Sequence, residues 1–226
     1  MDQKTGTQLE SFTHAFFAKK NLIQAKYGWK DDDARLTIFN KINRLLAAIN
    51  IGYFLSYTYL RQKSWWKEHE AFGVDENGMR VAGDDFEMLL RIGMGVNLVS
   101  CVESSFRIFT KALNPSACSN GTAEFKSIYE FIFKQLGLQQ LVTLLDLLRN
   151  IRNTIHNNGL FFPPKGQNQT VIYNGTVYHF EVGQLTHFVT TEFLIEILPD
   201  LLSLTEAVVE ASPLKDIDHI REISPP

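Results

Sequence analysis

The chain has 226 residues, of which 45% are hydrophobic and 21% charged, and these ordinary values exclude wholesale disorder. The formal net charge of −3 excludes a protein that holds nucleic acid through bulk positive charge, but it leaves room for a small local phosphate site. Two cysteines are too few for a disulfide framework or a thiolate zinc site.

The sequence gives no sign of secretion or membrane insertion. The first six residues are polar and lack the apolar segment of a secretory signal. The longest uncharged run, Leu45–Leu60, is shorter than the ~18–20 apolar residues that a membrane span needs. We therefore expect a soluble cytoplasmic protein with no membrane partner.

The N-terminal half has the hydrophobic periodicity of long helices. A capping-box pattern predicts a first helix over 7–28, and an acidic run predicts that a second helix begins near 31 and extends as far as 70. The glycines within 73–83 predict a loop. A third helix is expected over 84–113, because Asn114-Pro115 ends the pattern.

Two further helices are expected over 123–136 and 138–157. Gly137 separates them, and the run Asn157-Asn158-Gly159 is a strong stop signal. The pattern then changes, because two β-rich segments flank Asn174-Gly175, a pair suited to the positive φ angles of a two-residue hairpin turn.

The last helical stretch is expected over 184–211, with Pro199 bending or dividing it. Residues 212–226 contain three prolines and mixed charge, which predicts a flexible tail. The fold class is therefore mainly α: a helical bundle, formed by a single domain over 1–211, with a small β-hairpin near 170–180.

The helix over 138–157 carries the most informative pattern. At roughly 100° per residue, its core-facing residues fall in one arc: Leu141, Leu144, Leu147, Leu148, Ile151 and Ile155. Arg149, Asn153 and His156 lie together on the opposite face. A guanidinium and an imidazole on one face can converge on a phosphate.

Toward the start of the helix, the side that carries Arg149, Asn153 and His156 carries apolar residues instead. Leu138, Val142 and Leu145 occupy positions where a solvated face would be polar. An apolar patch that leads into a basic patch is typical of a contact surface. We therefore expect these three residues to form the interface of a homodimer.

Cations in the last turns of a helix are common for a simpler reason, because they interact favourably with the helix dipole. The longer string Leu148-Arg-Asn-Ile-Arg-Asn-Thr-Ile-His-Asn-Asn-Gly159, however, resembles the Arg-polar-x(n)-His motif of the HEPN superfamily (higher eukaryotes and prokaryotes nucleotide-binding domain). It is similar to the version found in bacterial members linked to stress and phage defence. The resemblance covers an expected core over about 85–210, with an N-terminal helical extension over 7–72.

The resemblance implies a metal-independent endoribonuclease that works as a homodimer on an RNA substrate and needs no cofactor. It implies catalytic roles for Arg149, which stabilises the phosphate, and for His156, which transfers a proton or positions the 2′-hydroxyl. Asn150 is the polar residue that follows the arginine and orients the site. Arg152, Asn153 and Asn157 are expected to support the site or contact RNA. The setting implied is a bacterial toxin or antiviral defence, with a cognate inhibitor or defence-system component as a further partner.

Other candidate groups have simpler explanations. Glu103 and Arg107 are four residues apart, which is typical of a surface ion pair, although a supporting role beside the motif is the alternative. His179 and His187 have no carboxylate at metal-ligand spacing, so no metal site is expected.

Two other functions stay open at this point. One is a catalytically inactive HEPN-like module that binds a nucleotide, an RNA or a protein partner. The other is a helical scaffold with no nucleic-acid role.

Overall fold

A computed structural model describes residues 3–69, 73–117, 124–155, 157, 159–163 and 165–222. The helices are α1 Gln3–Tyr27, α2 Ala34–Leu55, α3 Lys63–Glu68, α4 Glu76–Leu113, α5 Phe125–Leu136, α6 Val142–Ile155, α7 Thr191–Glu196 and α8 Leu198–Glu210. The strands β1 Gln169–Tyr173 and β2 Thr176–Phe180 form one antiparallel hairpin. The predicted class, a mainly α fold with a small hairpin, is confirmed.

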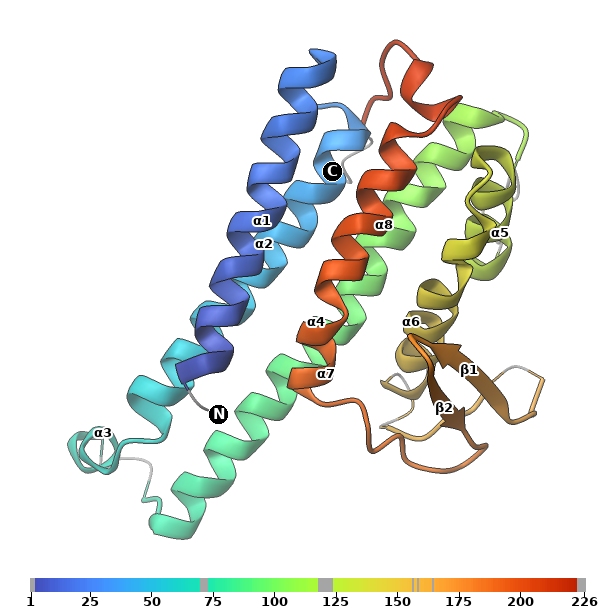
Figure 1. Cartoon of the computed structure of the whole chain (residues 1–226). Coiled ribbons are helices and arrows are strands. Elements are labelled where there is room, and N and C mark those ends of the chain that lie inside the picture. The colour runs from blue at the N-terminus through green and yellow to red at the C-terminus, as the bar shows by residue number, and fades with distance from the viewer. Residues whose placement is uncertain are drawn as a thin grey trace.

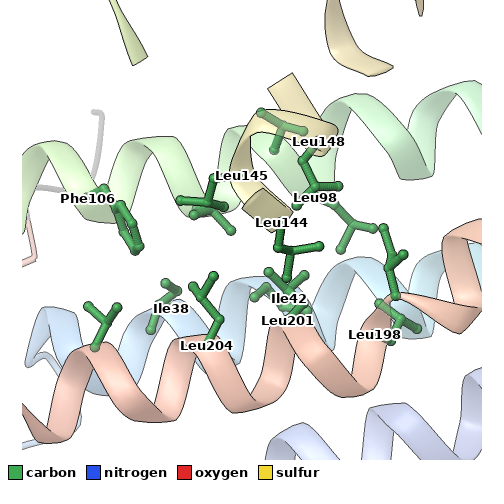
Figure 2. Packing of buried hydrophobic residues seen from close by; sticks show 14 of the residues in the cluster. Ile38, Ile42, Leu98, Phe106, Leu144, Leu145, Leu148, Leu198, Leu201 and Leu204 are labelled. Atoms are coloured by element: carbon green, nitrogen blue, oxygen red, sulfur yellow. The ribbon is translucent and has the colours of Figure 1, made fainter. Parts of the chain in front are cut away.

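The long helices pack side by side around one core. In Figure 1, α1 and α2 form an antiparallel pair on one side of α4, and α5, α6 and the hairpin lie on the other side. Apolar side chains from α2, α4, α6 and α8 meet between them, as the cluster in Figure 2 shows: Ile38, Ile42, Leu98, Phe106, Leu144, Leu145, Leu148, Leu198, Leu201 and Leu204. This core fixes α6 against α4, and so positions the motif.

The region predicted as a loop over 73–83 is mostly helical, so that prediction is wrong. Helix α4 begins at Glu76, where the Asp75 side chain accepts a hydrogen bond of 2.7 Å from the Gly78 amide. Gly83 lies within the helix, and a Cβ at this position would stand 2.8 Å from Nε of Arg61. The glycine therefore serves close packing rather than a turn.

The second predicted helix is interrupted before residue 70. Helix α2 ends at Leu55 and continues as a π-helical turn, Ser56–Leu60, before the short helix α3. The side chain of Ser56 is buried and donates a hydrogen bond of 2.8 Å to Glu87 of α4. This bond joins the π-helical turn to α4.

The predicted hairpin is present with its turn at the expected residues. Asn174 and Gly175 both have positive φ, 47° and 76°, and Tyr173 pairs with Thr176 across the turn. The last predicted helix is divided rather than bent, because Pro199 stands in the first turn of α8. Helix α7 begins only at Thr191, so residues 184–190 are not helical.

The expected flexible tail is instead packed on the bundle over residues 212–222. Leu214 and Ile220 are buried, and backbone atoms of this segment bond to the start of α2. The buried Arg35 side chain donates to the carbonyls of Leu214, Lys215 and Ile217, at 2.7–3.0 Å. The last four residues of the predicted tail lie outside the described residues.

Among the described residues, no helix combines the length and the apolar character that crossing a bilayer requires.

Candidate functional site

Helix α6 carries the motif and is held between α4, α5 and β1. Its buried positions are Leu144, Leu145, Leu147, Leu148, Asn150, Ile151 and Thr154. The helix ends two residues earlier than predicted, at Ile155. The amides of Asn157 and Gly159 both donate to the carbonyl of Thr154, at 3.0 and 2.8 Å, and Gly159 has a φ of +87°.

His156, the predicted proton-transfer residue, lies outside the described residues. Its neighbour Asn157 is described, and the Asn157 side-chain amide donates a hydrogen bond of 2.7 Å to the carbonyl of Asn153. This bond satisfies a carbonyl that the end of the helix would otherwise leave free. In this structure, Asn157 therefore closes the helix.

Arg149 is held by groups from two neighbouring elements. Its Nη2 donates to Oε1 of Gln169 in β1 at 3.2 Å and lies 3.8 Å from Oδ1 of Asp146. The hydroxyl of Tyr129 in α5 donates to the same Asp146 oxygen at 2.5 Å. The Arg149 side chain keeps 18% of its surface exposed. The guanidinium is thus oriented from α5, α6 and β1 and still reaches the surface.

The Tyr129 hydroxyl remains a proton donor in this network. Burial and the neighbouring Asp146 carboxylate raise the pKa of Tyr129 well above its usual value. Asp146 therefore receives a neutral hydrogen-bond donor from one side and the Arg149 guanidinium from the other.

Arg152 is paired with a carboxylate of α4. Its Nη1 donates to Oε2 of Glu103 at 3.0 Å, while Oε1 of Glu103 accepts from Arg107 at 2.5 Å. Glu103 therefore joins the motif helix to α4, in addition to its predicted pairing with Arg107. This contact agrees with the alternative given above for Glu103, a supporting role beside the motif, although a separation of 49 residues gave no signal that Arg152 is its partner.

Asn150 is not on the surface of the motif. Its side chain is only 1% exposed, and neither its amide nitrogen nor its amide oxygen has a hydrogen-bond partner among the described residues. The expected role of Asn150 in orienting the site stays a prediction, and its burial places the side chain away from the surface where RNA would bind. A buried, unpaired amide costs about 1–3 kcal/mol of stability.

Replacing Asn150 with leucine is expected to raise the free energy of unfolding by about 1 kcal/mol, because a side chain of similar size then occupies the site without unpaired polar atoms. Chemical denaturation followed by circular dichroism measures this change. Asn153→Leu, on the partly exposed side of the same helix, is the matched control and should change stability by less. A large loss of stability in Asn150→Leu would show that the amide has a partner in solution.

The three predicted interface residues do not form one exposed stripe. Leu145 has no exposed surface and belongs to the core, where Figure 2 shows it with Leu98 and Phe106 of α4. Its place in a dimer interface is therefore a wrong prediction, because α4 crosses that side of α6. Leu138 and Val142 are partly exposed and pack against the same core.

The fold brings His179 and His187 together in a way that their spacing did not indicate. Both line one hollow of about 540 Å³ beside β2, and Glu181 lines it as well. Within the described part of the chain, however, no three histidine, cysteine, aspartate or glutamate side chains are grouped so that they could hold a metal ion.

A second hollow, of about 500 Å³, lies between the hairpin tip, the start of α6 and α8. Asp200 stands at its edge and accepts hydrogen bonds from the hydroxyl of Tyr173 and, at 2.9 Å, from the amide of Asn174. These bonds attach the hairpin tip to α8. Of the predicted site residues that the structure describes, only Leu138 lines either hollow.

Comparisons with protein-family models, with curated proteins and with solved structures found no match to this chain.

Proposed function

We propose that this protein is a metal-independent endoribonuclease of the HEPN type, acting as a homodimer on RNA, with Arg149 and His156 as its catalytic residues. The observation that carries the proposal is the position of the Arg149 side chain and the contacts that orient it. Its guanidinium is partly exposed and is oriented by Asp146 and Gln169 on the helix that leads directly into residue 156. A guanidinium that is held in place and partly exposed is suited to binding a phosphate.

In the proposed reaction the 2′-oxygen of the RNA attacks the adjacent phosphorus, and the bond from phosphorus to the 5′-oxygen breaks. A proton leaves the 2′-hydroxyl and a proton reaches the 5′-oxygen, and an imidazole is suited to these transfers near neutral pH. Arg149 stabilises the negative charge that develops on the phosphate oxygens. The products are a 2′,3′-cyclic phosphate and a 5′-hydroxyl.

Arg152, Asn153 and Asn157 supply the nearest further contacts for the RNA backbone in this proposal. Arg152 and Asn153 are partly exposed on α6, and Asn157 follows the helix. The biological setting that we propose is bacterial toxin activity or antiviral defence in the cytoplasm. A cognate inhibitor or another defence component would restrain such an activity.

The test is cleavage of a mixed single-stranded RNA pool in the presence of a chelator. Wild type is expected to cleave the pool and leave cyclic-phosphate ends, whereas His156→Ala should be slower by a factor of about 10²–10⁴, because general acid–base catalysis contributes this much. His179→Ala, at an exposed histidine of the hairpin, is the matched control and should cleave normally. Equal rates for wild type and His156→Ala would rule out the assignment.

A second candidate, a module that binds RNA or another partner without cleaving it, is favoured by one observation. Arg149 and Arg152 each already face a carboxylate of the chain, Asp146 and Glu103. These pairs weaken cleavage more than binding, because the transition state of cleavage carries more negative charge on its phosphate oxygens than bound RNA does and needs more positive charge to stabilise it. The same RNA pool separates the candidates, because the binding module retains RNA on a filter and leaves it uncut.

A further inference from the structure

The hairpin has a free strand edge. The described residues form a sheet of two strands, and β1 lies against α6, so no strand lies beside the outer edge of β2 (Figure 1). The two-residue turn makes Tyr173 and Thr176 a hydrogen-bonded pair, and such pairs alternate with non-bonded pairs along an antiparallel ladder. Val177 and His179 therefore direct their backbone N–H and C=O groups away from β1.

These outward backbone groups of Val177 and His179 receive no hydrogen bond from the rest of the described chain. Residues 184–188 pass beside β2, but their backbone bonds go elsewhere, as when the Thr186 amide donates to the carbonyl of Gly159. The strand, Thr-Val-Tyr-His-Phe, also lacks the lysine or proline that commonly protects an exposed edge. An edge of this kind is a template for a further strand.

The hollow beside β2 lies along this edge. It measures about 540 Å³, with β2 on one side and residues 184–188 on the other. Val177 and Leu185 line it and are exposed, and Ile172, which lies opposite Val177 in the hairpin, is exposed as well. An extended chain placed in the hollow can pair with β2 while its side chains pack on this apolar surface.

The carboxylate of Glu181 indicates which partner fits. Glu181 directly follows β2 and lines the hollow with Val177 and His179. Its side chain is exposed and has no ion-pair partner among the described residues. In an added antiparallel strand, the residue that faces Glu181 precedes the residue that faces Val177 by four positions. A basic residue at the first position and an apolar residue at the second complement these two side chains.

We propose that the edge of β2 binds an extended peptide segment of a protein partner by antiparallel strand addition. Backbone hydrogen bonds to Val177 and His179 supply the affinity, and a basic residue followed four positions later by an apolar residue supplies the specificity. The docking site does not depend on the proposed function. Only an effect of the partner on RNA cleavage would rest on it, because β1 also holds Arg149 through Gln169.

Fluorescence anisotropy with a synthetic peptide tests strand addition. The probe is a labelled seven-residue peptide in which lysine precedes isoleucine by four positions, with threonine and valine elsewhere. Wild type is expected to bind it saturably. Methylating the peptide amides one at a time should weaken binding about tenfold at every second position only, because alternate amides of an added strand face β2. A peptide that does not bind, or that loses affinity equally at all positions, would overturn the proposal.

A charge exchange tests the specificity. Glu181→Lys is expected to weaken binding of the lysine peptide by about threefold to tenfold, and to bind a peptide with glutamate in place of that lysine better than wild type does. Glu196→Lys is the matched control, because Glu196 is an exposed glutamate of α7 that does not line the hollow. Identical behaviour of the two variants would overturn the proposed partner.

Val177→Pro separates the peptide from other occupants of the edge. Proline removes one outward donor without removing a bond to β1, so peptide binding should fall by about tenfold while circular dichroism stays unchanged. A wild-type dimer that Val177→Pro dissociates, seen by light scattering, would overturn the proposal in favour of a second copy. A Val177→Pro variant that binds the peptide normally but no longer retains the RNA pool would overturn it in favour of RNA.

Peptide binding is measured without RNA, so that this proposal and the proposed function fail separately. A protein that binds the peptide but cleaves no RNA supports the docking site and overturns the nuclease. A protein that cleaves RNA but does not bind the peptide overturns the docking site alone.

Discussion

Replacing Arg35 with methionine is expected to lower the free energy of unfolding by about 3–5 kcal/mol, the usual cost of leaving a buried charge without its partner. Arg35 and Asp33 are both fully buried, and two hydrogen bonds of 2.8 and 2.6 Å join them. The variant leaves the buried Asp33 carboxylate without the Arg35 guanidinium. It also removes the hydrogen bonds that this guanidinium donates to backbone carbonyls of the C-terminal segment. The Trp29 ring, whose centroid is 3.8 Å from Cζ of Arg35, loses a cation–π contact as well.

Urea denaturation followed by circular dichroism measures this loss. Arg80→Met is the matched control, because Arg80 forms an exposed pair with Asp84 and should cost less than about 1 kcal/mol. Adding Asp33→Asn to Arg35→Met should recover about 1–2 kcal/mol, since the amide keeps the cap of α2 but carries no buried charge. An effect of Arg35→Met no larger than that of Arg80→Met would contradict the role assigned to this pair.

The same pair predicts how stability depends on pH. Burial alone would raise the pKa of Asp33, but hydrogen bonds from the Arg35 side chain and from the amides of Arg35 and Ile220 outweigh it, so the pKa lies below its usual value. A lowered carboxyl pKa stabilises the fold above the unfolded value of about 3.9, and this stabilisation is lost as pH falls through the folded pKa. The stability difference between wild type and Asp33→Asn should therefore be largest near neutral pH and shrink below about pH 4.

Replacing Arg149 with alanine is expected to slow RNA cleavage by a factor of about 10²–10³, the usual effect of removing one group that stabilises transition-state charge. The fold should survive, because Asp146 keeps its hydrogen bond from Tyr129. Arg149→Lys should recover only part of the rate, since an ammonium keeps the charge but lacks the planar fork that meets Gln169 and a phosphate together.

Single-turnover cleavage in chelator measures the rates, and thermal unfolding shows that each variant is folded. Arg80→Ala, far from α6 in the sequence and exposed, is expected to cleave at the wild-type rate. A folded Arg149→Ala that cleaves as fast as wild type would remove Arg149 from the mechanism and leave the binding module as the better proposal.

Helix content and the hairpin could be predicted because their signals are local. The turn at Asn174 and Gly175 needs positive φ at both positions, and few other residues adopt it. The apolar positions of α6 at Leu144, Leu147, Leu148 and Ile151 are all buried as their periodicity indicated. Helical periodicity identifies the face of a helix that packs against the main hydrophobic core, and these four residues of α6 lie on that face.

Periodicity did not report the second covered side of α6. Leu145 and Asn150 lie outside the predicted core arc, yet both are buried, because α6 packs against more than one neighbouring element. The start of α4 was not predicted either, because Gly78 and Gly83 are typical of loops. In the structure the Gly78 amide donates to the capping Asp75 side chain, and Gly83 leaves room for Arg61. These positions are set by contacts between segments that are distant in the sequence.

Local sequence patterns were enough to predict the helical class and the hairpin, and they contain the string 148–159 that motivates the nuclease proposal. Two contacts depended on how the helices pack: the Arg35 guanidinium donates to backbone carbonyls within 214–218, and Glu103 pairs with Arg152. The physical reason is that local propensity acts through near neighbours along the chain. Burial and ion pairing, in contrast, depend on which helices the core brings side by side.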